Sequence, residues 1–141
     1  MDSVDPRPPG GIMETAIYAA DVAAAVAFYR DVFGLTVVTE VPGRLAFLMC
    51  GQQMLLIFNP ELSQQPDPTH AIPRHGATGQ GHFCFRASDK DEVAAWRAHF
   101  ARLGIAVERF QVWQGGTHSV YVRDPAGNSV EVGEAALWGF D

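Results

Sequence analysis

The chain has 141 residues, of which 48% are hydrophobic and 18% are charged, and its formal net charge is −6. This length suits one compact domain, or one domain made of two similar halves. The acidic balance and the scattered Lys and Arg argue against a nucleic-acid partner, since such proteins usually carry a basic patch. No apolar run approaches the roughly 18 residues of a membrane span. The N-terminus also lacks the apolar core of a signal peptide, so we expect a cytoplasmic protein with no membrane partner.

The first half of the chain is predicted to form one β-α-β-β-β unit. Residues 1–11 are polar and rich in Pro and Gly, so we expect a flexible lead before the domain. Asp21 is a suitable N-cap for a helix that ends near Phe33, before Gly34. Apolar runs separated by Pro-Gly and Gly-Gln turns predict short strands. This unit covers residues 12–59, with strands at 13–19, 35–41, 44–50 and 53–58.

The second half repeats this order after a linker at residues 60–79, which is rich in Pro, Gln, Gly and His. A loop this long is often functional or mobile. The second unit covers residues 80–133, and its helix is expected to begin at Asp89. Glu92 gives that start the character of a capping box, with Ser88 as a competing cap. The predicted strands of this unit are 81–87, 105–110, 119–123 and 128–132.

Two further predictions concern burial. Cys50 and Cys84 each lie in an apolar run, which favours reduced, buried thiols over a disulfide scaffold. The C-terminal tail, residues 134–141, carries Leu137, Trp138 and Phe140 among its few side chains. We therefore expect the tail to pack against another part of the protein.

The two halves are equivalent in detail, because Glu14 precedes the helix cap Asp21 by the same interval at which His82 precedes Asp89. Such a repeat predicts a duplicated α+β fold in which each helix packs on one face of its sheet. Alternation along a strand then places Glu14 and His82 on the faces turned away from the helices. Glu131 occupies the same kind of face between two valines of the last strand.

These three residues suggest one divalent metal site. Each alone is more often a solvated residue or a histidine with an ordinary hydrogen bond. A buried carboxylate without a partner is costly, however, and metal coordination satisfies it. One imidazole and two carboxylates suit Mn, Fe, Ni, Co or Zn. We therefore predict that Glu14, His82 and Glu131 bind one metal ion and leave positions open for water and substrate.

Other polar residues are candidate substrate contacts. Tyr18 and Arg86 share the faces of Glu14 and His82, and His118 follows two glycines at the start of a strand, with its facing unresolved. His75, in the linker, could reach the mouth of a site or remain solvated. His99 lies outside the apolar stripe of its helix, so we expect it at the surface. The chain has no nucleophile elbow, phosphate loop or CxxC motif.

Three stretches together resemble the vicinal oxygen chelate superfamily, which contains glyoxalases, bleomycin resistance proteins and dioxygenases. They are Asp21-Val22 with Ala27–Leu35 (AFYRDVFGL), Gly81–Phe85 (GHFCF) and Tyr121–Glu131 (YVRDPAGNSVE). The resemblance implies two βαβββ modules that form a cupped, eight-stranded mixed sheet with helices on the outer face. It also implies that a metal held by Glu14, His82 and Glu131 chelates substrate through adjacent oxygens.

The chain departs from this family at two positions. Many members, including extradiol dioxygenases, have His where this chain has Glu14, which argues against a two-His-one-carboxylate iron site. Glyoxalase I enzymes have a fourth ligand at a position that corresponds to about Leu55, which cannot bind a metal. Many relatives are dimers with sites built from both chains, so we expect a homodimer in which Glu14 can join His82 and Glu131 of the second copy.

Two functions follow from this reading. The first is a metal-dependent lyase, isomerase or dioxygenase that stabilises an oxyanion of a small oxygenated molecule, with Glu14 or Glu131 exchanging between ligand and base. The second is a metal-free binding protein of the bleomycin-resistance type, with a cup lined by Tyr18, Trp113 and Trp138.

Overall fold

A computed structural model describes residues 5–66 and 72–141 of the chain, and the repeat is visible in its order of elements. The first module consists of β1 (Glu14–Tyr18), α1 (Val22–Asp31), β2 (Thr36–Val41), β3 (Leu45–Cys50) and β4 (Gln53–Phe58). The second consists of β5 (His82–Ala87), α3 (Lys90–Arg102), β6 (Arg109–Val112), β7 (His118–Arg123) and β8 (Ser129–Glu134). A short helix, α2 (Pro60–Ser63), lies between the modules, and a 3₁₀ turn, η1 (Ala135–Trp138), follows β8.

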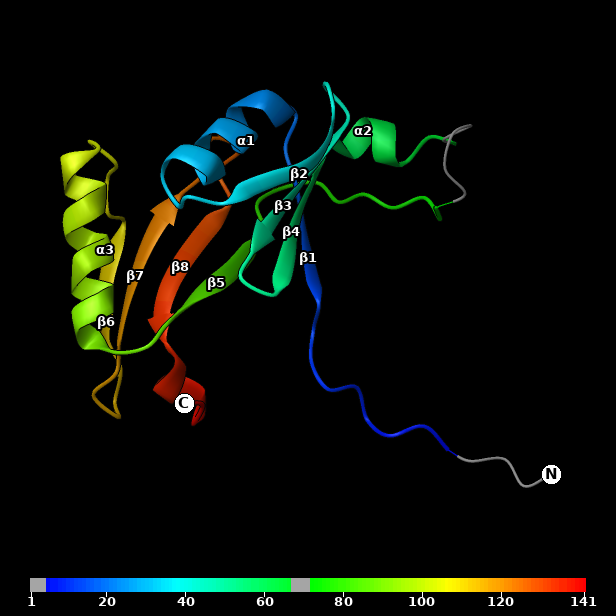
Figure 1. Cartoon of the computed structure of the whole chain (residues 1–141). Helices are drawn as coiled ribbons and strands as arrows, with labels where there is room; N and C mark the ends of the chain where they lie inside the picture. The colour runs from blue at the N-terminus through cyan, green and yellow to red at the C-terminus, as the bar shows by residue number, and fades with distance from the viewer. Residues whose placement is uncertain (1–4, 67–71) are drawn as a thin grey trace.

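Each module forms its own four-stranded mixed sheet, with the strand orders β1-β4-β3-β2 and β5-β8-β7-β6. In both, the first strand of the module runs parallel to the last strand and leaves its other side unpaired. The two open sheets lie side by side, with α3 along the second sheet and α1 above the region between them (Figure 1). The predicted α+β fold of two βαβββ modules is confirmed, and its eight strands are divided equally between two sheets.

Both long helices begin and end where the sequence predicts. The Asp21 side chain accepts a hydrogen bond from the Ala24 N–H at 3.0 Å, and Asp89 accepts one from the Glu92 N–H at 2.9 Å. Glu92 in turn accepts from the Ser88 N–H at 3.0 Å, so Asp89 is the cap and Ser88 is its reciprocal partner. Gly34 and Gly104 follow the two helices with φ of +72° and +71°, a conformation that favours glycine.

Helix α1 joins the modules through the apolar core. The Phe33 ring lies 4.5 Å from the Phe85 ring and 5.1 Å from the Trp96 ring, measured between centroids. The buried Tyr29 hydroxyl donates to Asp124 at 2.7 Å. The predicted surface position of His99 is wrong, because its Nε2 lies 2.8 Å from the Val32 carbonyl oxygen at the end of α1.

The structure differs from the predicted elements at two places. Strand β6 spans Arg109–Val112, whereas the prediction was 105–110. Ile105 and Val107 pack against the core without joining the sheet, so their hydrophobicity reflects burial rather than strand pairing. In the C-terminal tail, the expected packing is partial: Arg86 of β5 lies 5.8 Å from the Phe140 ring, but Trp138 and Phe140 are still 77% and 61% exposed.

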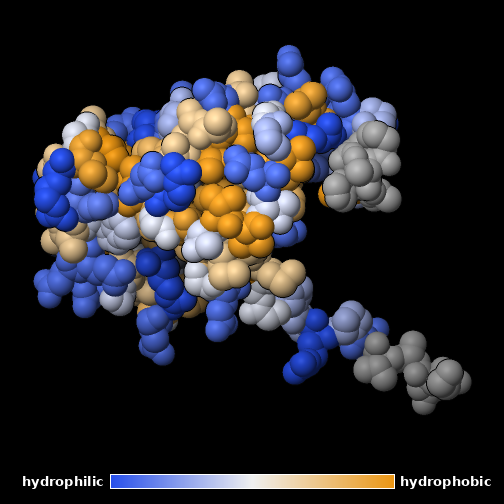
Figure 2. Space-filling model, turned by 45° about the horizontal axis from the view of Figure 1, so that its top comes forward, coloured by the Kyte–Doolittle hydropathy of each residue, from blue (hydrophilic) through white to orange (hydrophobic). Residues whose placement is uncertain are grey.

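The described parts of two segments outside the modules, the N-terminal lead and the linker, lie at the surface of the molecule. Figure 2 shows the described part of the N-terminal lead projecting away from the rest of the protein, with Ile12 and Met13 78% and 73% exposed. The predicted linker contains α2, and its residues 67–71, like residues 1–4 of the lead, lie outside the described part of the chain. Within the described residues, no helix combines the length and the hydrophobicity that crossing a membrane requires.

Candidate metal centre

A row of polar side chains crosses the open face of the second sheet, opposite α3. Glu131 on β8 is directly opposite Cys84 on β5 and Tyr121 on β7, and Tyr121 is opposite Arg109 on β6. Directly opposite residues of neighbouring strands point to the same side of a sheet. The alternating valines at 120, 122, 130 and 132 are buried on the other side. The fold therefore gathers a thiol, a carboxylate, a phenol and a guanidinium in one line.

His82 lies beside this row with one ring nitrogen turned toward Glu131. Its Nδ1 is 3.1 Å from the Ser129 carbonyl oxygen and 3.3 Å from the Ser129 hydroxyl. Because a carbonyl oxygen only accepts, the Nδ1 carries a proton and the Nε2 is the ring nitrogen turned toward the carboxylate. That Nε2 is 3.3 Å from Glu131 Oε1. Ring orientation through the second nitrogen in this way is typical of metal-binding histidines.

Glu131 is the least satisfied polar group in this neighbourhood. It is 6% exposed, and its Oε2 is a buried oxygen without a hydrogen-bond partner. Gly133, two residues on, leaves room above it: a Cβ there would lie 2.8 Å from Ser119 Oγ, 3.0 Å from Glu131 Oε2 and 3.1 Å from Cys84 Sγ. A buried carboxylate that lacks donors is costly. The unpartnered Oε2 and the His82 Nε2 beside the same carboxylate together fit a divalent cation.

The Glu131 charge also affects its neighbours. The pKa of Tyr121 is raised to about 12, mainly because the phenol is partly buried and secondly because of the Glu131 charge. The same two causes, in the same order, raise the pKa of the Cys84 thiol to about 12. Both groups are therefore neutral near pH 7. Alternation turns Cys84 to the open face, where the residue as a whole is exposed, so the expectation of a buried side chain is wrong, although its thiol is partly removed from water beside Glu131.

The third predicted ligand, Glu14, lies apart from the other two within one chain. It is exposed on β1, at the free edge of the first sheet, whereas His82 is on β5, at the free edge of the second. Among residues 5–66 and 72–141, no three His, Cys, Asp or Glu side chains are grouped closely enough to hold one metal ion. The structure thus brings together His82 and Glu131 and leaves Glu14 at an equivalent edge elsewhere.

The first sheet offers no fourth ligand. Leu55, the predicted equivalent of the fourth glyoxalase I ligand, is 3% exposed and belongs to the core. The residue paired with Glu14 on β4 is Met54, and Leu56 and Phe58 follow on the same face. A thioether and two hydrocarbon side chains do not suit a hard divalent cation.

The predicted substrate contacts are spread over the molecule. Tyr18 donates or accepts a hydrogen bond with His75 Nδ1 at 2.8 Å, so His75 is held against the first module rather than solvated. Arg86 donates to the Asp141 carbonyl oxygen and lies 5.8 Å from the Phe140 ring. His118 packs its ring against Phe110 at 5.1 Å, on the side of β7 that faces α3. None of the three touches the His82–Glu131 pair.

Several residues of the site were missed in the sequence. Tyr121 stacks on the His82 ring with centroids 6.1 Å apart, and Ser129 orients that ring. Ser119 accepts a hydrogen bond from the Trp113 indole at 2.9 Å beside the Glu131 carboxylate. Ser119 and Tyr121 alternate with buried valines, and this pattern was the available signal. Their pairing with β8 was needed to place them beside Glu131.

The paired modules, the two open sheets and the His–carboxylate pair define a class of protein. Residues 11–132 match the glyoxalase/bleomycin resistance protein/dioxygenase superfamily, and the chain belongs to that superfamily.

Individual relatives agree with this assignment. A crystal structure described as lactoylglutathione lyase from Agrobacterium tumefaciens is 60% identical, with a TM-score of 0.92, and the match covers 95% of this chain and 100% of that one. The virulence protein STM3117 of Salmonella typhimurium is 27% identical over 120 residues, which are 82% of this chain and 77% of that protein. A glyoxalase/bleomycin resistance protein/dioxygenase from Nocardioides, at 19% identity and a TM-score of 0.71, shares the fold over 93% of this chain and 85% of its own.

Proposed function

We propose that the protein is a divalent-metal-dependent enzyme of the glyoxalase type, acting on a small molecule that binds through two adjacent oxygens. The observation that supports it most is the contact between His82 Nε2 and Glu131 Oε1 at 3.3 Å, beside an unpaired and buried Glu131 Oε2. An imidazole nitrogen and a carboxylate oxygen at this separation need a proton or a cation between them, and the unpartnered Oε2 beside them favours a cation. A metal ion satisfies both of them and leaves room for substrate.

The complete site is proposed to form between two copies of the chain. His82 and Glu131 come from one copy, and Glu14 comes from the free edge of β1 in the other. Edge strands with unpaired backbone groups readily pair with another chain, and both β1 and β5 are such edges. This arrangement supplies one imidazole and two carboxylates, a set that suits Mn, Fe, Ni, Co or Zn.

The residues of this chain have distinct roles in the proposed reaction. A bound metal supplies Lewis-acid stabilisation of negative charge on the substrate oxygens. Ser129 fixes the orientation of the His82 ring through Nδ1. Glu131 is proposed to exchange between metal ligand and base and to accept a proton from the substrate carbon next to those oxygens, which its unpartnered Oε2 supports. Tyr121, neutral with a pKa of about 12, can donate a hydrogen bond to a substrate oxygen.

Among reaction types, a lyase or isomerase is favoured. The relative of 60% identity is described as a lactoylglutathione lyase, and a carboxylate able to move a proton suits that chemistry. The absence of a carboxylate near Glu14 on β4 distinguishes this site from a four-ligand glyoxalase I centre. Turnover should therefore be tested on hemithioacetals of glutathione and methylglyoxal, with catechols and epoxide antibiotics as the competing substrate classes.

Metal content tests the proposal directly. After purification without chelators, the wild-type protein should contain a stoichiometric transition metal by elemental analysis, and Glu131→Gln should lose it. Glu134→Gln is a matched control, because Glu134 is also buried on β8 but accepts a hydrogen bond from the His118 N–H on the opposite face. Metal content that is equal in both variants would refute the assignment of Glu131.

The alternative is a metal-free binding protein, and one observation favours it. The face of the first sheet that carries Glu14 is otherwise apolar, with Leu56 and Phe58 beside Tyr18, as a cup for a hydrophobic ligand would be. Of the other two proposed cup aromatics, Trp113 is engaged by Ser119, and Trp138 is exposed. Purified protein that contains no metal and shows no thermal shift with Mn, Fe, Ni, Co or Zn would support this function instead.

A further inference from the structure

We infer that Arg109 forms an anion subsite beside the candidate metal centre, so that the substrate has a carboxylate in addition to its two adjacent oxygens. This inference rests on the proposed function, because it assumes that the oxygens bind near His82 and Glu131. It identifies a residue that selects among oxygenated molecules.

The position of Arg109 in the sheet supports the inference. Arg109 is opposite Tyr121, which is opposite Glu131, so the guanidinium is two strands from the carboxylate on one face. Two strand spacings are about 10 Å, and the long arginine side chain can reach back over part of that distance.

A hollow of suitable size lies over these residues. It has a volume of about 470 Å³ and is lined by Arg109 together with Tyr121 and Ser129, the two residues that contact the His82 ring. Small-molecule sites of about 300–1,000 Å³ are usual. The hollow is lined by Glu108, Arg109, Gln111, Trp113, Tyr121, Arg123 and Ser129.

Charge pairing singles out Arg109 on this face. Arg123 donates to both Glu108 oxygens, at 2.7 and 3.1 Å, and is thereby neutralised. Arg86 donates to the Asp141 carbonyl oxygen at the C-terminus. Arg109 instead donates to the neutral Gln111 side chain at 2.7 Å, and no carboxylate contact is present for it within residues 5–66 and 72–141. The chain has a net charge of −6, yet Arg109 has no carboxylate partner among the described residues and lines a hollow. Its guanidinium is therefore suited to bind the carboxylate of a ligand.

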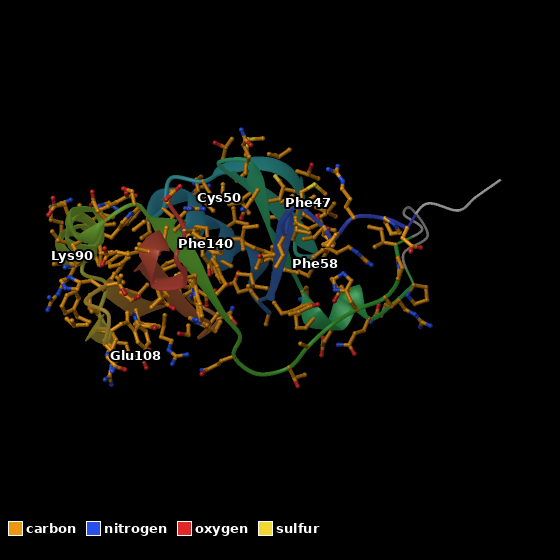
Figure 3. All side chains as sticks on the ribbon, turned by 90° about the horizontal axis from the view of Figure 1, so that it is seen from below. Phe47, Cys50, Phe58, Lys90, Glu108 and Phe140 are labelled. Carbon is orange, nitrogen blue, oxygen red and sulfur yellow. The ribbon has the colours of Figure 1, made fainter. Side chains whose placement is uncertain are left out.

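The other sheet cannot supply this recognition. Figure 3 shows Phe47 and Phe58 of the first module on the side of the molecule away from Glu108, which lies at the edge of the second module. The open face of the first sheet includes Phe47, Leu56 and Phe58 with the Tyr18–His75 pair, and the carboxylate of Glu14 on the same face would repel an anion. If two copies join as proposed, a ligand between them meets one apolar wall and one polar wall. The anionic end of the ligand must then lie on the second sheet, near Arg109.

A pair of metal-chelating probes tests the subsite by binding alone. Succinic acid monohydroxamate and the matching succinamide hydroxamate both chelate a metal through two adjacent oxygens, and they differ only in a carboxylate against a neutral amide. Isothermal titration of the metal-loaded protein should give about tenfold tighter binding of the carboxylate probe. Arg109→Gln should reduce that preference to below about twofold without changing the affinity for the amide probe. Arg97→Gln is the matched control, because Arg97 lies over the Phe110 ring on the opposite side of the sheet and its loss should leave the preference intact.

The possible outcomes separate the subsite from the proposed function. Equal binding of the two probes by the wild-type protein would refute the anion subsite and leave the metal centre standing. Binding of neither probe would refute the metal centre, and the subsite with it. Loss of the native oligomer in Arg109→Gln, measured by sedimentation, would show that Arg109 contacts protein rather than ligand and would also overturn the inference.

Discussion

Buried carboxylates in this protein differ in how fully their oxygens are hydrogen-bonded. Asp124 is 5% exposed and accepts hydrogen bonds from the Tyr29 hydroxyl, the Ala126 and Asn128 N–H groups and the Asn128 amide. Glu131 is equally buried, yet one of its oxygens accepts none. Hydrogen bonds thus offset the cost of burying the Asp124 carboxylate. At Glu131 that cost is not offset, and a bound cation would reduce it. Asp124 is a structural residue and Glu131 is the functional candidate.

The Tyr29–Asp124 hydrogen bond should contribute measurably to stability. Tyr29→Phe removes a donor to a buried carboxylate at 2.7 Å without leaving a cavity. We expect the free energy of unfolding to fall by about 1.5–3 kcal/mol, the usual range for hydrogen bonds to charged groups. Urea denaturation of the wild-type and variant proteins checks this. No change in stability would mean that the bond contributes nothing net of desolvation.

The same pair predicts how stability depends on pH. Burial, followed by the Asp124 charge, raises the pKa of Tyr29 well above its ordinary value of 10.0. Above about pH 10 the unfolded chain therefore loses this proton while the folded protein keeps it, and stability falls by up to about 1.4 kcal/mol per pH unit. In Tyr29→Phe this contribution is absent, so the stability difference between the two proteins should shrink as the pH rises from about 9 to 11. A constant difference across that range would contradict the raised pKa.

At the level of elements, both modules place a capped helix directly after an edge strand. The caps at Asp21 and Asp89 fix where α1 and α3 begin, and so fix how β1 and β5 enter their sheets. Because β5 carries His82 and β1 carries Glu14, the start of each helix helps to set the direction of a candidate ligand. Helix starts are encoded locally, which explains why they were predicted correctly.

Replacing the cap of α3 tests this local encoding. Asp89→Ala removes the acceptor for the Glu92 N–H and should lower the free energy of unfolding by about 1 kcal/mol. Asp89→Asn keeps an acceptor at the same place and should be nearly neutral. Thermal denaturation followed by circular dichroism measures both. Equal loss in the two variants would indicate that the charge of Asp89, rather than its cap, stabilises the helix.

For the molecule as a whole, one chain carries an incomplete set of the proposed ligands. His82 and Glu131 are together, Glu14 is elsewhere, and no group of three metal-binding side chains occurs in the described part of the chain. The exposed Ile12, Met13, Trp138 and Phe140 lie near the chain ends, where a second copy could cover them. A dimer with shared sites accounts for both features.

Mixed dimers provide a test at this scale. Glu14→Gln and Glu131→Gln should each lose metal alone. If the two variants are unfolded and refolded together, half of the dimers should be mixed, and each mixed dimer has one site with all three native ligands. The expected recovery is about a quarter of the wild-type metal content, because half of the dimers are mixed and one of the two symmetry-related sites in each is complete. No recovery, with dimers confirmed by sedimentation, would mean that Glu14 and Glu131 do not share a site across the interface.

The sequence by itself determined the duplicated α+β fold, the helix caps and the orientation of His82 and Glu131, because alternation and capping depend on neighbours along the chain. It could not determine that β6 begins at Arg109 or that His99 contacts α1, since these depend on packing between distant segments. Only the tertiary structure placed Tyr121 and Arg109 in line with Glu131, because strand pairing sets that register. It also separated Glu14 from its expected partners, because the two sheets end at different edges.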